Sequence, residues 1–368
     1  MDFTFHMPVR VISGEGCLKR DGQFLRQWGR RCLVVTGESG AAASGARADA
    51  LALLADIGVE ATLFPGIGAN PLLSQVQNAA FAAEFWKADF LLGIGGGSVM
   101  DATKAAAWLA ANNISDPGKL FTGAMRRPSL PFALVGTTAG TGSEVSAVAV
   151  ITDDRDGRKR SIKGPQCYAR AAFADPIYTH SLPRAATVST ALDALSHTVE
   201  GWFSPACGEV AAAFGEKAFR LVSEGLGWLR DHDGLPDAAV RESLLYGSLW
   251  AGMVLNATGT AFPHLMGYAL TEDFGVPHGM ACAVFLPAFT RRAERFAPER
   301  AAAMFQLCGG RDNYISLLEA LVRTDVRMTE EQTGEYAARW EGDAKWQKVP
   351  GGYSAGEGAN LLRELFVP

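Results

Sequence analysis

Three histidines and one aspartate in the C-terminal half have the residue types and spacing of a metal site. Asp193 and His197 stand four residues apart within residues 190–203, a stretch rich in Ala and Leu that predicts a helix. Four residues make about one helical turn, so the two side chains would lie one above the other. His264 and His278 follow in a second segment, each directly after a proline. Because a carboxylate and imidazoles can converge on one divalent ion, we predict a metal held by these four residues.

A helical Asp–His pair is more often a surface hydrogen bond or a helix-end interaction. The neighbours argue for a buried pair, because Ala191, Leu192, Ala194 and Leu195 make this helix largely apolar. Buried charges need a partner or a metal. We expect Glu200, three residues after His197, to support the ligands or the helix rather than to bind the ion.

Two glycine-rich segments further towards the N-terminus could bind a nucleotide. Residues 95–97 are three glycines between an apolar run and a helical pattern, and Ser98 follows them. Free N–H groups at such a helix start attract phosphate, although a plain tight turn explains the glycines equally well. Residues 136–144, GTTAGTGSE, again follow an apolar run, and their hydroxyls suit ribose, phosphate or a nicotinamide amide. Segments of this composition are also common as ordinary turns.

The elements that would position these groups fall into two kinds. Apolar runs at 32–36, 90–94 and 132–135 each precede a glycine turn, and the repeated strand–turn–helix order predicts a doubly wound α/β sheet. We expect further strands at 148–151 and 171–174, flanking a charged turn. After residue 182 only helical patterns follow, so we predict a dinucleotide-binding α/β domain over 1–182 and an all-α metal- and substrate-binding domain over 183–368.

Composition excludes several classes of function. The 368 residues are 48% hydrophobic and 20% charged with a formal charge of -5, which argues against a nucleic-acid partner. None of the six cysteines forms a CxxC pair, so we expect no disulfide framework and a reducing, cytoplasmic setting. The N-terminus predicts no signal peptide, and no apolar run is long enough to span a membrane.

Four segments in order along the chain, GGGSVMDATKAAA, GTTAGTGSEVS, LDALSHTVEGWFS and FPHLMGYALTEDFGVPHG, together resemble the iron-containing (group III) alcohol dehydrogenase family of the dehydroquinate synthase-like superfamily. The resemblance implies a Rossmann-like nucleotide domain, a helical domain and an active site in the cleft between them. By position it implies metal ligation by Asp193, His197, His264 and His278. It also implies cofactor contacts from the glycine loops and nearby residues: Asn70, Gly96, Gly97, Ser98, Thr137, Thr138 and Lys159. It places Asp101 near the nicotinamide as a candidate catalytic residue, and we add Ser143 to the cofactor contacts because of its hydroxyl.

Two positions depart from the family pattern. Tyr268 stands where many members have a second histidine near the nicotinamide, so its hydroxyl could pass a proton, or the ring could simply wall the substrate pocket. Gly37 stands where many members that use NAD have an aspartate that would repel a 2′-phosphate, and Ser39 could donate to such a phosphate. We therefore expect NADP(H) to be favoured, with NAD(H) possible.

The predicted function is metal-dependent hydride transfer between NAD(P) and a small alcohol or aldehyde, with Fe²⁺ or Zn²⁺ as the ion. By family analogy we expect a homodimer, with the extended arm 3–12 pairing with the partner's sheet. The alternatives are a maleylacetate, glycerol or phosphonate-aldehyde type of reductase on the same scaffold, a dehydroquinate synthase-like lyase, and a nucleotide-binding module without activity.

Overall fold

The computed structural model describes residues 3–113, 115–123 and 125–368. It divides the chain into two compact units. The α/β unit comprises His6–Pro183 and Asp237–Leu245, and the helical unit comprises Met1–Phe5, Arg184–Pro236 and Tyr246–Pro368. Each unit carries one of the two groups of residues that the sequence singles out, so each is described by itself.

A six-stranded sheet forms the centre of the α/β unit, and all its strand pairs are parallel. The strand order is β1-β8-β5-β4-β2-β3. The strands of this sheet are β1 (Arg10–Ser13), β2 (Arg31–Thr36), β3 (Glu60–Phe64), β4 (Phe90–Gly95), β5 (Phe132–Gly136) and β8 (Ala171–Ala174). β2, β4 and β5 are almost wholly buried, as expected of apolar strands covered on both faces.

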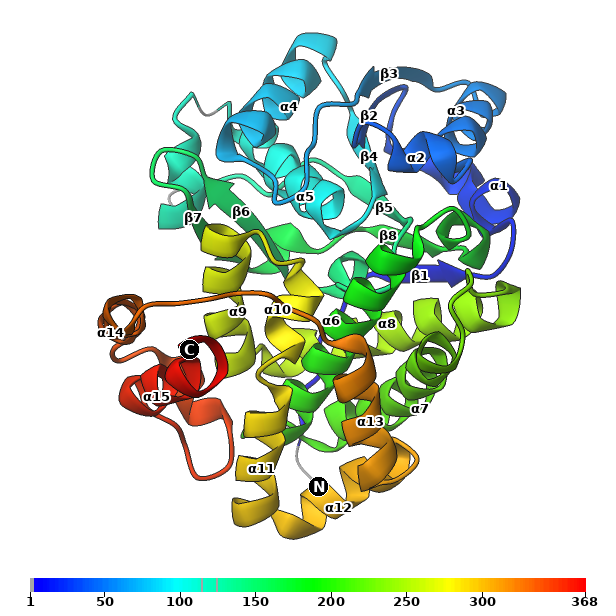
Figure 1. Ribbon diagram of the computed structural model, residues 1–368. Helices are drawn as coiled ribbons and strands as arrows, with labels where there is room; N and C mark the ends of the chain where they lie inside the picture. Colours follow the sequence, from blue (N-terminus) through cyan, green and yellow to red (C-terminus); the bar gives the residue numbers. More distant parts are fainter. Residues whose placement is uncertain (1–2, 114, 124) are drawn as a thin grey trace. The chain divides into compact units, whose positions relative to one another are not determined.

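Helices cover both faces of this sheet, because successive side chains of each strand point to opposite sides. Leu33 and Val35 of β2 belong to the core under α4 and α5, while Cys32 and Val34 belong to the core under α1 and α3 (Figure 1). The helices on the two faces of the sheet are α1 (Cys17–Asp21), η1 (Gly22–Trp28), α2 (Gly40–Ala43), α3 (Ala46–Asp56), α4 (Leu73–Trp86), α5 (Gly97–Asn112) and η2 (Pro117–Thr122). This arrangement is the doubly wound α/β fold that the sequence predicts.

One strand pairing differs from the prediction. β6 (Val148–Asp153) pairs in antiparallel fashion with β7 (Arg158–Lys163) across the charged turn, whereas residues 171–174 form β8 in the main sheet. β7 reads RKRSIK, and its cations are mostly exposed, so it lacks the apolar run by which the other strands were recognised. Short 3-10 turns complete this part of the chain: η3 (Ser143–Val145), η4 (Pro165–Cys167) and η5 (Pro176–Thr179).

The helical unit is built around α6 (Arg184–Phe203), whose residues 191–203 are all buried. α6 packs against α7 (Glu209–Asp231) and α10 (His278–Ala283), and α10 also packs against α9 (Phe262–Phe274). The remaining elements are α8 (Ala238–Thr258), which continues from the α/β unit, α11 (Leu286–Phe296), α12 (Pro298–Leu307), α13 (Arg311–Leu321), α14 (Glu330–Arg339), η6 (Ala344–Lys348) and α15 (Ala355–Phe366).

After β8 the described residues contain no further strand, as the helical patterns predict. None of the helices in the described ranges is long and apolar enough to cross a bilayer.

Candidate metal and nucleotide sites

α6 presents three polar side chains from the interior of the helical unit. Asp193, His197 and Glu200 follow each other at helical spacing, and each is at most 5% exposed. Burying such polar side chains costs free energy unless they find hydrogen-bond or ion-pair partners. The position of α9 and α10 beside α6 supplies these partners.

A tight connection brings His264 of α9 and His278 of α10 to the same place. α9 ends at Gly275, which has a φ of 68°, and α10 begins three residues later at His278. Gly279 lets α10 approach α6 backbone to backbone, since a Cβ at this position would lie 1.8 Å from the carbonyl oxygen of Ser189. The distance between Asp193 and His278 therefore depends on a glycine that has no role in binding the ion.

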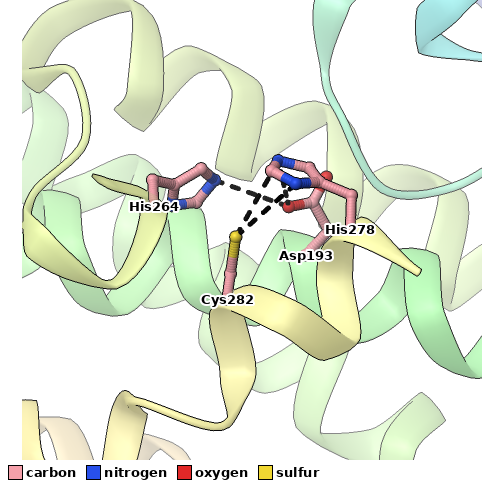
Figure 2. Close-up of side chains that lie close together, drawn as sticks. All are labelled: Asp193, His264, His278 and Cys282. Atoms are coloured by element: carbon pink, nitrogen blue, oxygen red, sulfur yellow. Dashed lines mark hydrogen bonds and ion pairs between the residues drawn. The ribbon is translucent and has the colours of Figure 1, made fainter. Parts of the chain in front are cut away.

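The four side chains predicted as ligands lie close together, and we call them the metal cluster. Asp193 Oδ1 is 3.5 Å from His264 Nε2 and 3.9 Å from both His278 Nε2 and His197 Nε2. The rings of His197 and His264 are stacked at 4.6 Å. Figure 2 shows Asp193, His264 and His278 converging from their separate helices.

Glu200 fixes the orientation of one of these histidines. Its Oε1 lies 2.5 Å from His264 Nδ1, and its Oε2 accepts a hydrogen bond of 2.6 Å from the backbone N–H of Ala261. If Nδ1 carries the proton and donates it to the carboxylate, the Nε2 lone pair faces Asp193. A carboxylate behind a histidine is the usual support of a metal-binding imidazole.

The electrostatics of the cluster are those of closely packed opposite charges. Burial acts to raise the pKa of Asp193, but His197, His264 and His278 outweigh it and hold that pKa below its ordinary value. Burial acts to lower the pKa of His264, yet Cys282 and Glu200 raise it well above its ordinary value.

Two atoms of the cluster test whether a metal fits. Asp193 Oδ1 and His264 Nε2 are buried, and neither has a hydrogen-bond partner in the part of the chain that the structure describes. Buried polar atoms are rarely left in this state, and one divalent ion between them would satisfy both. The donor set of carboxylate and imidazole suits Fe²⁺ or Zn²⁺.

One tight group of possible ligand atoms contains three of the four predicted ligands, without His197, and one residue that the sequence reasoning missed, Cys282. The ligand atoms of Asp193, His264, His278 and Cys282 all lie within 4.8 Å of one another (Figure 2). Cys282 stands one helical turn after His278 on α10, the same spacing that relates Asp193 and His197 on α6. This His–x–x–x–Cys spacing was the available signal.

In the α/β unit, most of the predicted nucleotide residues follow the carboxyl ends of strands of the main sheet, whereas Lys159 lies on β7 of the two-stranded sheet. β2, β4 and β5 are parallel neighbours, so Gly37, the loop 95–98 and the loop 136–144 all follow carboxyl ends of strands. From β2 the chain goes outward to β3 and then returns to β4 on the other side, which makes the β2–β4 edge the topological switch point. Ligands of open α/β sheets bind at this position. We call these segments the strand-end loops.

The glycines of the first loop are needed for packing against the second. A Cβ on Gly96 would lie 3.0 Å from Thr138 Cγ2, and a Cβ on Gly97 would lie 2.5 Å from Thr141 Cγ2. The backbone N–H of Thr137 also donates to Gly95 O at 3.0 Å. The two loops thus form one rigid surface in front of the N-terminus of α5.

Asp101 is committed to the framework of these loops. Its Oδ1 accepts a hydrogen bond of 2.6 Å from Ser143 Oγ, and its Oδ2 accepts one of 2.8 Å from the backbone N–H of Val150. Lys104 is fully buried next to it and donates to Ser146 and to Val148 O. Burial raises the pKa of Asp101, and Lys104 and Ser143 partly offset this rise.

The remaining predicted residues have the following places. Ser98 Oγ accepts a hydrogen bond of 3.1 Å from the backbone N–H of Asn70, whose φ is 54°. Ser39 is exposed directly before α2, and Lys159 lies on β7 opposite Thr152. Tyr268 lies on α9 and stacks on His278, with ring centroids 5.5 Å apart and an interplanar angle of 11°.

Comparison with known proteins identifies the family of both parts of the chain. The profile of the iron-containing alcohol dehydrogenase family matches residues 8–176, and that of the Fe-containing alcohol dehydrogenase family, C-terminal, matches residues 187–328. A sulfoacetaldehyde reductase of Bilophila wadsworthia is 29% identical over 85% of this chain and 80% of its own length. A 1,3-propanediol dehydrogenase of Klebsiella pneumoniae is 30% identical over 82% of this chain and 78% of its own length.

The fold agrees over almost the whole chain. The crystal structure of an iron-containing alcohol dehydrogenase from Thermotoga maritima has a TM-score of 0.91, with 30% identity over 99% of both chains. A sulfoacetaldehyde reductase from Bifidobacterium kashiwanohense in complex with NAD⁺ has a TM-score of 0.87 and 25% identity, again over 99% of both chains.

The chain belongs to the iron-containing alcohol dehydrogenase family. It is an oxidoreductase that interconverts alcohols and aldehydes with a nicotinamide dinucleotide. The family predicted from the four motifs is therefore confirmed. Membership in this family implies iron and a nicotinamide dinucleotide as cofactors.

Proposed function

We propose that this enzyme interconverts small alcohols and aldehydes with one divalent ion bound by Asp193, His197, His264 and His278. The observation that carries the proposal is the pair of buried atoms, Asp193 Oδ1 and His264 Nε2, which face each other at 3.5 Å and lack hydrogen-bond partners within the described residues. When bound, the ion supplies Lewis-acid polarisation of the substrate oxygen, and the nicotinamide supplies or accepts the hydride.

The chain's own residues would position the reactants. Glu200 holds the His264 ring with its Nε2 towards Asp193, which keeps this ligand ready to bind. In the α/β unit we propose that the loops 95–98 and 136–144 bind the dinucleotide, with its pyrophosphate at the N-terminus of α5. Since both oxygens of Asp101 are engaged by Ser143 and Val150, we propose that it holds these loops rather than reacts.

We propose that Tyr268 borders the substrate and passes the proton. The support is its ring, which stacks on the predicted ligand His278 and carries a hydroxyl. The variant Tyr268→Phe distinguishes proton transfer by the hydroxyl from a role in which the ring only lines the substrate pocket. If the hydroxyl passes the proton, kcat falls and its pH profile changes, whereas a wall residue would leave both unchanged.

We propose NADP(H) as the preferred cofactor. Gly37 has no side chain to repel a 2′-phosphate, and the exposed Ser39 lies two residues on. An aspartate at position 37 should change the ratio of kcat/KM for the two cofactors towards NAD by about tenfold or more, because a carboxylate beside a phosphate is repulsive. A Cβ at position 37 would lie 3.1 Å from Ile67 O, so Gly37→Ser provides the control for bulk without charge.

The test of the main proposal is elemental analysis of the purified protein combined with NADH and NADPH assays on short aldehydes. We expect about one equivalent of iron or zinc per chain and oxidation of the cofactor in the presence of aldehyde. A protein that retains its metal but causes no net change in cofactor absorbance would favour the lyase alternative. Cofactor binding without any turnover would favour the non-enzymatic alternative.

A second candidate is the reduction of aldehydes that carry a negative charge. Lys345 Nζ lies 4.9 Å from the centroid of the Tyr268 ring, so a cation stands one ring away from His278. The similar sulfoacetaldehyde reductases are named for such a substrate. If this candidate holds, Lys345→Met raises the KM of an anionic aldehyde about tenfold and leaves that of butanal unchanged.

We also propose a homodimer in a reducing compartment. β1 pairs with β8 and lies at the edge of its own sheet, where a partner strand could be added. The six cysteines are all free, as a reducing setting would require. Light scattering at two protein concentrations tests the dimer, and a monomer at both would refute it.

A further inference from the structure

The thiol of Cys282 lies where a metal ligand would lie. Its Sγ is 3.8 Å from His278 Nε2 and 3.9 Å from His278 Nδ1, and the residue is fully buried (Figure 2). His278 and Cys282 are one helical turn apart on α10, so both side chains extend from the same face of that helix. Neither the four motifs nor the expected ligand set includes this sulfur.

Distances decide whether the sulfur can share an ion with the other groups. Ligand bonds to a divalent metal are about 2.0–2.3 Å long, so two atoms on one ion lie at most about 4.6 Å apart. The ligand atoms of Asp193, His264, His278 and Cys282 all lie within 4.8 Å of one another. Four ligands of a tetrahedral site lie about 3.3–3.8 Å from one another. Asp193 Oδ1 is already 3.5 Å from His264 Nε2 and 3.9 Å from His278 Nε2. Cys282 Sγ is 3.8 Å from His278 Nε2, so these three distances are close to those of one shared ion.

A glycine on α9 leaves room for the sulfur atom of Cys282. A Cβ on Gly267 of α9 would lie 2.8 Å from Cys282 Sγ, so a larger residue there would push the thiol away. Across the same gap are Asp193 Oδ1 and His264 Nε2, both buried and without hydrogen-bond partners in the described ranges. A buried cysteine is often only a small apolar side chain, but such cysteines do not usually face unsatisfied polar atoms.

We propose that Cys282 is a ligand of the metal ion in this enzyme, so that the centre contains sulfur as well as oxygen and nitrogen. This inference rests on the proposed metal site. On binding, the thiol releases its proton to solvent as the sulfur–metal bond forms, and nothing is oxidised or reduced. Thiolate is a soft ligand, so the centre prefers Zn²⁺ or Co²⁺ over Mn²⁺ more strongly than a centre of Asp and His alone.

Cobalt provides the direct test, because a thiolate bound to Co²⁺ gives a charge-transfer absorption in the near ultraviolet. The full-length protein is stripped of metal with a chelator, dialysed and loaded with one equivalent of Co²⁺. We expect the absorption in the wild-type protein and in the control Cys308→Ser, which removes another buried thiol of the helical unit. Cys282→Ser should bind Co²⁺ without this absorption.

Chelator competition gives a second reading that does not depend on activity. For Cys282→Ser we expect the affinity for Zn²⁺ to fall about tenfold or more, and that for Mn²⁺ to change less than about threefold. Cys282→Ala serves if the serine variant does not fold, since alanine fits where the larger thiol fitted.

The wild-type spectrum alone can overturn the proposal. A cobalt-loaded wild-type protein without the sulfur absorption, or a Cys282 variant that keeps it, means that Cys282 only packs beside the ion. If the protein still binds cobalt in that experiment, the proposed metal site is not contradicted. A wild-type protein that binds no cobalt overturns both the ligand role of Cys282 and the proposed metal site.

Discussion

The metal cluster and the strand-end loops differ in how their polar groups are satisfied. Around the loops, the hydroxyl of Ser143, both oxygens of Asp101 and the ammonium of Lys104 have hydrogen-bond partners within the α/β unit, while Glu144 Oε2 is buried without one among the described residues. In the metal cluster, Asp193 Oδ1 and His264 Nε2 are buried with no such partner among the described residues.

This difference indicates two ways of preparing a binding site. Apart from Glu144 Oε2, the polar groups named at the loops are held by the protein's own hydrogen bonds, and we propose that these loops and the N-terminus of α5 bind the dinucleotide. In the metal cluster, one bound cation would satisfy both Asp193 Oδ1 and His264 Nε2. Substitutions at the two places should therefore differ in the kind of effect and in its size.

The largest effect is expected for His264→Ala. It removes a ligand from the middle of the cluster, so the chain should no longer retain its metal, and kcat/KM should fall about 10³-fold or more. Elemental analysis and steady-state kinetics measure both, and circular dichroism checks folding. His232→Ala, which removes an exposed histidine, is the control. An unchanged rate in His264→Ala would remove this residue from the reaction.

A smaller effect is expected for Glu200→Gln, which keeps the shape and removes the charge behind His264. The hydrogen bond of 2.5 Å between Glu200 and His264 would become neutral, so the affinity for Zn²⁺ should fall about 10- to 100-fold. Chelator competition at fixed pH measures it. If the affinity does not change, Glu200 only supports the helix, and metal binding by the cluster does not depend on the charge of Glu200.

In the strand-end loops, Gly97→Ala should act through shape. Its new Cβ would lie 2.5 Å from Thr141 Cγ2, so the two loops must separate. We expect a loss of about 1–3 kcal/mol in the free energy of unfolding and about tenfold weaker binding of NADPH, with metal content unchanged. Denaturant melts and fluorescence titration measure these quantities. Gly356→Ala, where a Cβ meets nothing within 4 Å, is the control.

A further expected effect is the pH dependence of metal binding. Burial opposes the charge on His264, but Cys282 and Glu200 raise its pKa well above the ordinary value, so a proton competes with the metal for this ligand. The apparent affinity for Zn²⁺ should weaken as the pH falls, by at most about tenfold per pH unit for each proton displaced. Isothermal titration between pH 6 and 8 measures the slope. The binding of NADPH should change less over this range.

The sequence predicts the parallel sheet because its central strands, β2, β4 and β5, are almost wholly buried and appear as apolar runs that lead into glycine turns. It missed β7, whose charged residues conceal a strand that is stabilised by pairing with β6. The two units also could not be bounded closely from patterns alone, since residues 237–245, part of a long helix, belong with the α/β unit.

At the metal cluster, the sequence supplied the candidate ligands but not their arrangement. The spacing of Asp193 and His197 suggests one helical face, His264 and His278 are the further imidazoles of a second segment, and the resemblance implies the same four residues. The same spacing between His278 and Cys282 was not noticed, because a scattered cysteine is usually read as a small apolar residue. Gly279 allows α10 to contact α6, a helix distant in the sequence, and no local sequence pattern indicates such a contact.

The contact of α10 with α6 at Gly279 has a practical consequence. Because the backbones themselves set the spacing of Asp193 and His278, the chelated protein should keep its helices in place and need no refolding to be reconstituted. Added metal would then restore turnover as fast as it diffuses in and sheds its water, so enzyme purified in an inactive, demetallated form should be recoverable on the bench.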